Sequence, residues 1–412
     1  MHLLILAYHF TSQNSVGNLR IQKFANSFQN LGYQVTLFSA VSSELAHDYP
    51  FRVIQFPISD FTLFFDRKPS SRSQESGNFW LKAILRLKNT FPFLYLLSPG
   101  GPQYRCAIQK AFKTLHTDQP VTHLLTSYDP VYDLIIGHDL KRKAPELHWI
   151  VDFRDLPVDP VKKNAYFPTL TNLFYRKLIR GADKITTVSQ GLAQHLPFRI
   201  KLIDVIYNGF DPKTVNHRPN LVSSKFTLTY TGTVHAKIQD PTPLFQALTV
   251  LFHRKQINPM DIELHIAGPQ SIIWRNWLKN YPFICLIDHG YLSTKEAIKL
   301  QQVSQINLLL TWSKNWSSGI LTTKLFEYLA ARRPILGLVN GKEDIELNKF
   351  IQSVNGGVCI YSSEPNKENK LTDWLFVQYN SWAKYKFIPS ENKIPAISQY
   401  QWDQLFSKWH LK

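Results

Sequence analysis

The sequence is poor in cysteine and in long apolar runs, and each shortage argues against a class of protein. Only 3 cysteines occur among 412 residues, Cys106, Cys285 and Cys359, and none forms a Cys-x-x-Cys pair. This spacing argues against a zinc cluster and is typical of a reducing compartment. No apolar run reaches the roughly 20 residues of a membrane-spanning helix. Met1–Ala7 lacks a basic leader and a cleavage site, so we expect a buried first strand there.

Acidic residues are also scarce relative to basic ones. The chain has 47 Lys and Arg against 30 Asp and Glu, a formal net charge of +17. Such an excess favours polyanionic partners. Zinc-finger spacing, an aromatic RNA-binding pattern and a basic heptad region are all missing, so nucleic acid is not the expected partner. We interpret the charge as phosphate binding together with attraction to an anionic membrane surface.

The length and the apolar pattern predict two α/β domains. A chain of 412 residues exceeds what one hydrophobic core usually serves. Strand residues 3–7, helix Leu19–Leu31 and strand Gln34–Phe38 form an opening βαβ pattern, which is typical of a doubly wound parallel sheet. The alternation resumes with strands at 226–231, 262–267, 284–287 and 306–310. Ser293 and Glu296 predict a capping box at the helix 295–302.

The stretch Gly319–Pro334 carries the strongest candidate site. Thr322 is expected to cap a helix over Lys324–Arg333, which Pro334 ends before a buried parallel strand at 335–339. A glycine-containing loop that leads into a helix N-terminus can hold an anion. Glu327 lies three residues after Lys324, so both lie on one polar face. Either this carboxylate binds sugar hydroxyls, or the two residues form a solvated Lys–Glu pair on an ordinary αβ unit.

This stretch resembles the nucleotide-sugar segment of retaining glycosyltransferase family 4, whose fold is GT-B. The resemblance implies two Rossmann-like doubly wound domains that face a central cleft. It places the acceptor domain at 1–210, completed by a C-terminal helix at 397–412, and the donor domain at 211–396. It also implies that Glu327 binds the nucleotide ribose. The family's other glutamate, eight residues earlier, is replaced here by Gly319, so recognition of the donor sugar must differ.

The resemblance implies further site residues at the donor loops. The loop at the donor diphosphate corresponds to Gly319, Ile320, Leu321, Thr322 and Lys324. The phosphate-binding loop after the strand 226–231 corresponds to Gly232 and Thr233. The usual basic residues of that loop are not matched in register. Lys237 is the nearest cation, and we expect it to stabilise the leaving diphosphate.

In the first domain the family has a glycine-containing loop with a nearby basic residue, which Gly17 and Arg20 match. A plain βα loop with a solvated Arg20 is the alternative. Asp152-Phe-Arg-Asp155 ends a strand and resembles the branch that acts on bacterial surface polysaccharides. Arg154 and Asp155 are accordingly expected beside the transferred sugar. The alternative is a strand-end salt bridge between Arg154 and an aspartate.

The expected activity is retaining transfer of a sugar from a nucleotide-sugar donor to a lipid-linked or polysaccharide acceptor. Neither a metal nor another cofactor is expected, since this fold holds the diphosphate with helix dipoles and basic side chains. A nucleotide-sugar epimerase on the same fold and a non-catalytic subunit remain alternatives. The basic, aromatic run 79–97 predicts contact with an anionic membrane. A helix packed on its own domain is the alternative. We expect a cytoplasmic protein, peripheral on the inner face of the cell membrane.

Overall fold

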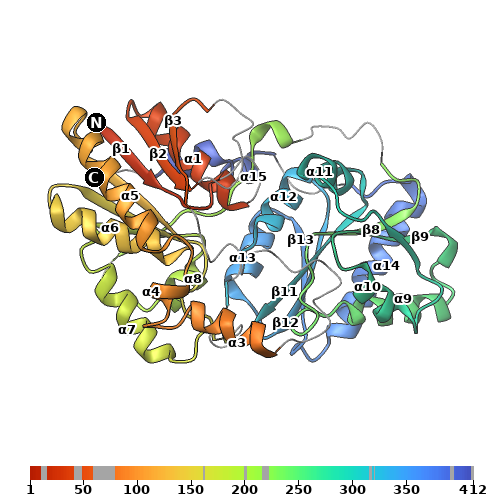
Figure 1. Cartoon of the computed structure of the whole chain (residues 1–412). Helices are drawn as coiled ribbons and strands as arrows, with labels where there is room; N and C mark the ends of the chain where they lie inside the picture. Colours follow the sequence, from red (N-terminus) through yellow and green to blue (C-terminus); the bar gives the residue numbers. More distant parts are fainter. Residues whose placement is uncertain are drawn as a thin grey trace. The chain divides into compact units, whose positions relative to one another are not determined.

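The computed structural model describes residues 1–10, 16–40, 49–58, 79–160, 163–198, 202–215, 222–314, 318–319, 321–389 and 394–409. The chain divides into two compact units (Figure 1). Unit 1 contains Met1–Tyr207 together with the end of the chain from Phe406, and unit 2 contains Asn208–Leu405. Each unit is an α/β structure with its own hydrophobic core.

Within the described residues, unit 1 is built on a parallel 7-stranded sheet with the order β3-β2-β1-β4-β5-β6-β7. Its strands are β1 His2–Leu6, β2 Gln34–Ala40, β3 Arg52–Phe56, β4 His123–Tyr128, β5 His148–Phe153, β6 Lys184–Thr187 and β7 Ile203–Val205. β1, β2, β4 and β5 are nearly all buried. Buried parallel strands of this kind carry continuous apolar runs, and those runs made the first strands predictable.

The helices of unit 1 connect these strands. They are α1 Val16–Asn30, α3 Phe79–Lys88, α4 Leu94–Leu97, α5 Gly101–Asp118, α6 Val131–Lys143, α7 Pro168–Leu178 and α8 Gln190–His195. The run 79–97 is divided between α3 and α4 by a turn that contains Pro92. Ser189 caps α8 by accepting a hydrogen bond from the Leu192 N–H at 3.1 Å.

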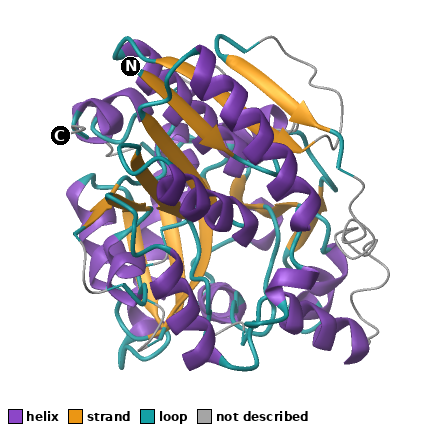
Figure 2. Ribbon diagram, turned by 60° about the vertical axis from the view of Figure 1, so that its left-hand side comes forward, coloured by secondary structure: helices purple, strands orange, loops and turns teal. Residues whose placement is uncertain are grey.

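Unit 2 has a parallel 6-stranded sheet with the order β10-β9-β8-β11-β12-β13. Its strands are β8 Phe226–Thr231, β9 Ile262–Ala267, β10 Cys285–Asp288, β11 Ile306–Ser313, β12 Ile335–Gly341 and β13 Gly357–Tyr361. All strand pairs in both described sheets are parallel, so the predicted doubly wound arrangement is confirmed. Figure 2 shows these strands with the helices packed around them.

The helices of unit 2 are α9 Thr242–His253, α10 Ser271–Leu278, α11 Thr294–Val303, α12 Thr323–Ala331, α13 Ile345–Ser353, α14 Lys367–Tyr385 and α15 Ile394–Ser398, with 3-10 turns at Pro212–Thr214 and Pro259–Asp261. The predicted capping box of α11 is present, with Ser293 and Glu296 each bonding the backbone of the other. Helix α12 ends at Ala331, where Arg332 takes a left-handed conformation before Pro334.

The single C-terminal helix expected at 397–412 is instead two short helices, α15 and α16 Trp402–Ser407. The backbone between them is used elsewhere: the Tyr400 carbonyl accepts from the Phe210 N–H at 3.2 Å, and the Trp402 N–H donates to the Phe210 carbonyl at 3.1 Å. A continuous helix would need those same groups for its own ladder.

None of the helices in the described part of the chain combines the length and the apolar character needed to cross a bilayer.

Candidate functional site

The carboxyl end of β8 in unit 2 brings together a glycine turn and a lysine from α12. The Lys324 ammonium donates to the Tyr230 hydroxyl at 2.8 Å and to the Thr233 carbonyl oxygen at 3.4 Å, and it lies 4.3 Å from the centre of the Tyr230 ring. A Cβ at Gly232 would meet Lys324 Cε at 2.7 Å, and its φ of +105° favours glycine. The structure therefore joins Gly232, Thr233 and Lys324, three of the predicted donor residues.

Glu327 follows one turn later and is held by a residue that the sequence did not single out. The Gln301 side-chain amide donates to Glu327 Oε2 at 3.0 Å and to the Thr231 hydroxyl at 2.9 Å. Gln301 is fully buried. It comes from α11, 26 residues away, so no local pattern marks it as a partner of Glu327. The amide fixes the orientation of a carboxylate that would otherwise turn freely.

Burial shifts the pKa values of both charged groups in opposite directions. Desolvation lowers the pKa of Lys324 to about 8, and the nearby Glu327 opposes that shift. Desolvation likewise raises the pKa of Glu327, and the Gln301 hydrogen bond and Lys324 oppose it. For each group the loss of hydration outweighs the favourable contacts with the protein. Shifted pKa values of this kind are common at binding and catalytic sites.

The start of α12 lacks a side-chain cap. Thr322 stands at the N-cap position, but its hydroxyl makes no capping bond and is buried without a hydrogen-bond partner among the described residues. The prediction that Thr322 caps the helix is therefore wrong. An uncapped helix start keeps donors and a positive dipole end available for an anion.

Two other residues of this loop, Gly319 and Leu321, make contacts inside the protein. The Gly319 N–H donates to Asp344 Oδ2 at 2.6 Å, and Asp344 also caps α13. The Leu321 side chain is buried. Gly319 and Leu321 can therefore shape the loop, but neither the Gly319 amide nor the Leu321 side chain is available to a ligand. Ile320 lies outside the described residues.

Lys237, the expected catalytic cation, takes no part in the contacts described above. It is exposed in the turn after Thr233 and forms no hydrogen bond or ion pair with any residue that the structure describes. Lys324 instead supplies the cation that contacts the β8 loop. The sequence register could not reveal this, because Lys324 reaches Tyr230 across 94 residues.

In unit 1, Gly17 and Arg154 lie against each other. A Cβ at position 17 would come within 1.9 Å of Arg154 Nη1, so only glycine leaves room for this guanidinium. Arg154 also donates from Nε to the Tyr128 carbonyl oxygen at 3.3 Å. Both residues stand at the carboxyl edge of the sheet, where ligands bind in open α/β folds. Asp155 follows Arg154 directly. Burial is the largest cause that raises the pKa of the Tyr128 hydroxyl, and the charge of Asp155 adds a smaller shift in the same direction.

A buried acid that the sequence analysis missed lies at the same edge. Asp133, in the first turn of α6, accepts from the Tyr8 N–H at 2.9 Å and from the Tyr104 hydroxyl at 3.0 Å. Burial raises the pKa of Asp133 to about 7, although those two donors and Arg154 oppose the shift. Acidic residues are common in the first turn of a helix, because they interact favourably with the helix dipole. The local sequence therefore does not distinguish Asp133 from an ordinary residue at a helix start.

Arg20 does not lie where a ligand could reach it. Its side chain is fully buried and forms a two-point ion pair with Asp152, with Nε and Nη2 at 2.9 Å and 2.8 Å from the two carboxylate oxygens. The remaining nitrogen, Nη1, donates to the Ile206 carbonyl oxygen at 2.8 Å. These contacts give no support to the prediction that Arg20 binds the donor. Arg20 is also not solvated, because the pair joins α1 to β5 inside unit 1.

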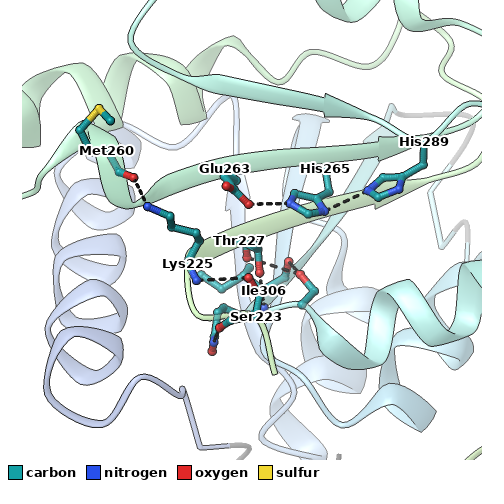
Figure 3. Close-up of polar contacts among 10 residues, drawn as sticks. Ser223, Lys225, Thr227, Met260, Glu263, His265, His289 and Ile306 are labelled. Carbon is teal, nitrogen blue, oxygen red and sulfur yellow. Dashed lines mark hydrogen bonds and ion pairs between the residues drawn. The ribbon is translucent and has the colours of Figure 1, made fainter. Parts of the chain in front are cut away.

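Three polar side chains, two on β9 and one directly after β10, are linked by hydrogen bonds in unit 2 (Figure 3). Glu263 and His265 of β9 lie 3.0 Å apart between Oε2 and Nε2, and His265 Nδ1 lies 3.0 Å from Nε2 of His289. Burial, then the adjacent His265, lowers the pKa of His289. With both rings neutral, the Glu263 carboxylate selects the His265 tautomer, and His289 must then donate to His265. This set of side chains ends beside Gly290 at the carboxyl edge of the sheet.

Among the residues that the structure describes, no cluster of three or more His, Cys, Asp or Glu side chains is arranged to hold a metal ion.

No family model matches the sequence, and a search of curated proteins finds no match either. Solved structures do match over nearly the whole chain. The trehalose-6-phosphate synthase OtsA and an E. coli structure bound with UDP-2-fluoro glucose each give a TM-score of 0.60 at 10% identity, covering 99% of this chain and 98% of theirs. The structure of TarM gives 0.59 at 8% identity, with coverage of 99% and 97%.

At this level of identity the likeness establishes the fold. Together with the two parallel sheets, it confirms the GT-B fold with two Rossmann-like domains that the sequence resemblance implied.

Proposed function

We propose that the protein is a glycosyltransferase that moves a sugar from a nucleotide-sugar donor to a hydroxyl group. The observation that supports this best is the position of Lys324, beside the Gly232 turn and at the uncapped start of α12. A diphosphate there would receive backbone N–H groups, a helix dipole and one ammonium group. UDP-2-fluoro glucose, bound in one of the similar structures, is a ligand of this chemical class.

Glu327 would then bind the ribose hydroxyls of the nucleotide. Its carboxylate is oriented by Gln301 and lies on the same side of α12 as Lys324. A carboxylate accepts two hydrogen bonds from vicinal hydroxyls, and these charged bonds are stronger than neutral ones. Catalysis would consist of positioning the donor and stabilising the leaving diphosphate, because no nucleophile is required from the protein.

The proposal extends to a retaining transfer of the family 4 type, with a lipid-linked or polysaccharide acceptor. Asp152-Phe-Arg-Asp155 supports the acceptor class by its resemblance to enzymes of bacterial surface polysaccharides. In this segment Asp152 is paired with Arg20, whereas Arg154 lies beside Gly17 at the carboxyl edge of the unit 1 sheet.

Calorimetric titration with a panel of nucleotide-sugars, followed by transfer assays with the donor that binds, tests the proposal. We expect Glu327→Ala to weaken nucleotide binding by about 1–3 kcal/mol while inorganic pyrophosphate binds as before. Exposed Glu343→Ala is the matched control. NMR of the product decides whether the anomeric configuration is retained.

Three outcomes would contradict the proposal in different ways. Release of an epimerised nucleotide or free sugar without transfer would indicate an epimerase. Nucleotide binding without turnover would indicate a non-catalytic subunit. The glycine at position 319, in place of the family's glutamate, would then be the first explanation to test for the lost activity. Unchanged nucleotide affinity in a folded Glu327→Ala variant would remove Glu327 from the site.

A further inference from the structure

Exposed apolar side chains gather where α3, α4 and α7 of unit 1 pack together. We call this surface the α4–α7 face, and it is defined by Leu85, Phe93, Tyr95, Leu96, Tyr166, Phe167, Leu170 and Leu173. Their exposed fractions run from 37% at Tyr95 to 78% at Leu96. Exposed apolar side chains that gather on neighbouring elements often mark a surface that binds something.

The two chain segments that form the face are joined by direct contacts. The Phe91 ring stacks on Phe174 at 5.1 Å, and the Tyr95 ring meets Phe174 edge-on at 5.6 Å. The Phe91 N–H donates to the Thr171 hydroxyl at 3.2 Å. In Figure 1, α3, α4 and α7 lie beside one another. Segments about 80 residues apart in the sequence thus form one surface.

The charge of these segments is of one sign. Residues 76–117 and 160–182 contain no Asp or Glu, whereas they contain several Lys and Arg. Arg86 stacks over the Tyr166 ring at 4.3 Å and is partly buried. Exposed basic groups come from both segments: Lys110 and Lys113 from the first, and Lys163, Arg176, Lys177 and Arg180 from the second.

Along α7 the apolar and basic side chains share one side of the helix. Leu170, Leu173 and Lys177 follow one another at intervals of three and four residues, and Arg180 lies two residues beyond the end of the helix. This arrangement places rings and leucines beside ammonium and guanidinium groups. Interfacial helices on membranes combine these two side-chain types in the same way.

We propose that the α4–α7 face docks on the surface of an anionic lipid bilayer. Aromatic and aliphatic side chains enter the headgroup region, while Lys163, Lys177 and Arg180 meet lipid phosphates. The complete lack of acidic residues in both segments fits a uniformly anionic surface better than a protein partner, whose surface carries both signs. This inference stands independently of the proposed sugar transfer, and it adds α7 to the membrane contact expected from the run 79–97.

Sedimentation of the full chain with vesicles tests the inference. We expect binding to vesicles of phosphatidylglycerol and phosphatidylcholine in equal parts, and little binding to phosphatidylcholine alone. Raised salt should remove part of the binding, because the Debye length shortens while the apolar contribution persists. Salt-independent binding to both vesicle types would overturn the role of charge.

Two double variants with matched controls locate the contact. Lys177→Glu with Arg180→Glu, and separately Phe167→Ser with Leu173→Ser, should each weaken binding to the anionic vesicles by about tenfold. Arg254→Glu with Lys279→Glu reverses the same charge on unit 2, and Ile272→Ser with Val377→Ser removes exposed apolar groups there. These controls should bind as the unchanged protein does.

Circular dichroism and thermal melting exclude unfolding as the cause of any loss. Equal binding by the α7 variants and the controls would overturn the assignment of the face. Failure of the unchanged protein to bind anionic vesicles would overturn the proposal and would favour a protein partner.

Discussion

Burial makes the charge of Lys324 sensitive to pH. Its ammonium contacts a neutral hydroxyl, a carbonyl oxygen and an aromatic ring. Burial lowers its pKa to about 8, although the nearby Glu327 opposes that shift. A bound diphosphate would bring negative charge and raise that pKa again. The affinity for nucleoside diphosphates should therefore depend on pH in a defined direction.

We predict that nucleoside diphosphate affinity is highest below about pH 8 and falls as the pH rises through that value. Calorimetry over a pH series, in buffers of different ionisation enthalpy, should also detect proton uptake on binding near pH 8. Lys324→Met should lose both effects and weaken binding by about 1–3 kcal/mol. Lys237→Ala is the control. If it loses more nucleoside diphosphate affinity than Lys324→Met does, Lys237 is the cation that binds the phosphates.

Asp133 makes the stability of unit 1 depend on pH. Its carboxyl titrates at about 7 in the folded protein, because burial outweighs the Tyr8 and Tyr104 hydrogen bonds. In the unfolded chain it titrates near 4. Between these values the folded state holds a proton that the unfolded state has lost. The contribution of Asp133 is thus fully present below about pH 4, declines as pH rises, and is lost above about pH 7.

We predict that Asp133→Asn removes this decline. The variant loses one hydrogen-bond acceptor at every pH, but its stability relative to the unchanged protein should improve by about 2–4 kcal/mol between pH 4 and pH 8. Denaturant unfolding at several pH values measures the difference. A constant difference across that range would show that Asp133 stays ionised in the folded protein.

At the scale of elements, the start of α1 and the end of β5 meet through Gly17 and Arg154. The space that glycine leaves is filled by the guanidinium, whose flexible end can move away. A methyl group at position 17 would therefore disturb the placement of Arg154 more than the fold. Alanine also has the higher helix propensity, so α1 itself should not weaken.

We predict that Gly17→Ala lowers transfer activity by about tenfold, since misplacement of one cation by an ångström is costly. The melting temperature should be unchanged or slightly higher. In an Arg154→Ala background the same substitution should have no further effect, as a double-mutant cycle would measure. Additive losses would mean that Gly17 acts without Arg154.

For the whole molecule, the end of the chain belongs to the core of unit 1. Phe406 is buried and meets the Phe24 ring at 4.8 Å, and Trp409 donates from its indole to Asp204 at 3.0 Å. Trp409 also packs edge-on against Phe24 and Phe28. Unit 1 therefore depends on residues 406–409 for part of its packing.

We predict that Phe406→Ala costs unit 1 about 3–5 kcal/mol, the usual cost of emptying a buried phenylalanine site. Hydrogen exchange followed by mass spectrometry should show faster exchange in β1, β2 and α1, with unit 2 unchanged. The exposed Lys408→Ala is the control. Equal protection in the Phe406 variant would show that the tail contributes little to unit 1.

The sequence alone determined the parallel α/β alternation, most strand positions and the capping box of Ser293 and Glu296, because these depend on apolar spacing and on side chains a few residues apart. It also identified the α12 segment with Lys324 and Glu327. Only the tertiary structure placed Gln301 on Glu327, Lys324 on Tyr230, and Arg20 in an internal ion pair instead of a ligand site. It alone joined the two acid-free segments into one face. Those contacts depend on strand order and packing, which bring together residues that no local periodicity connects.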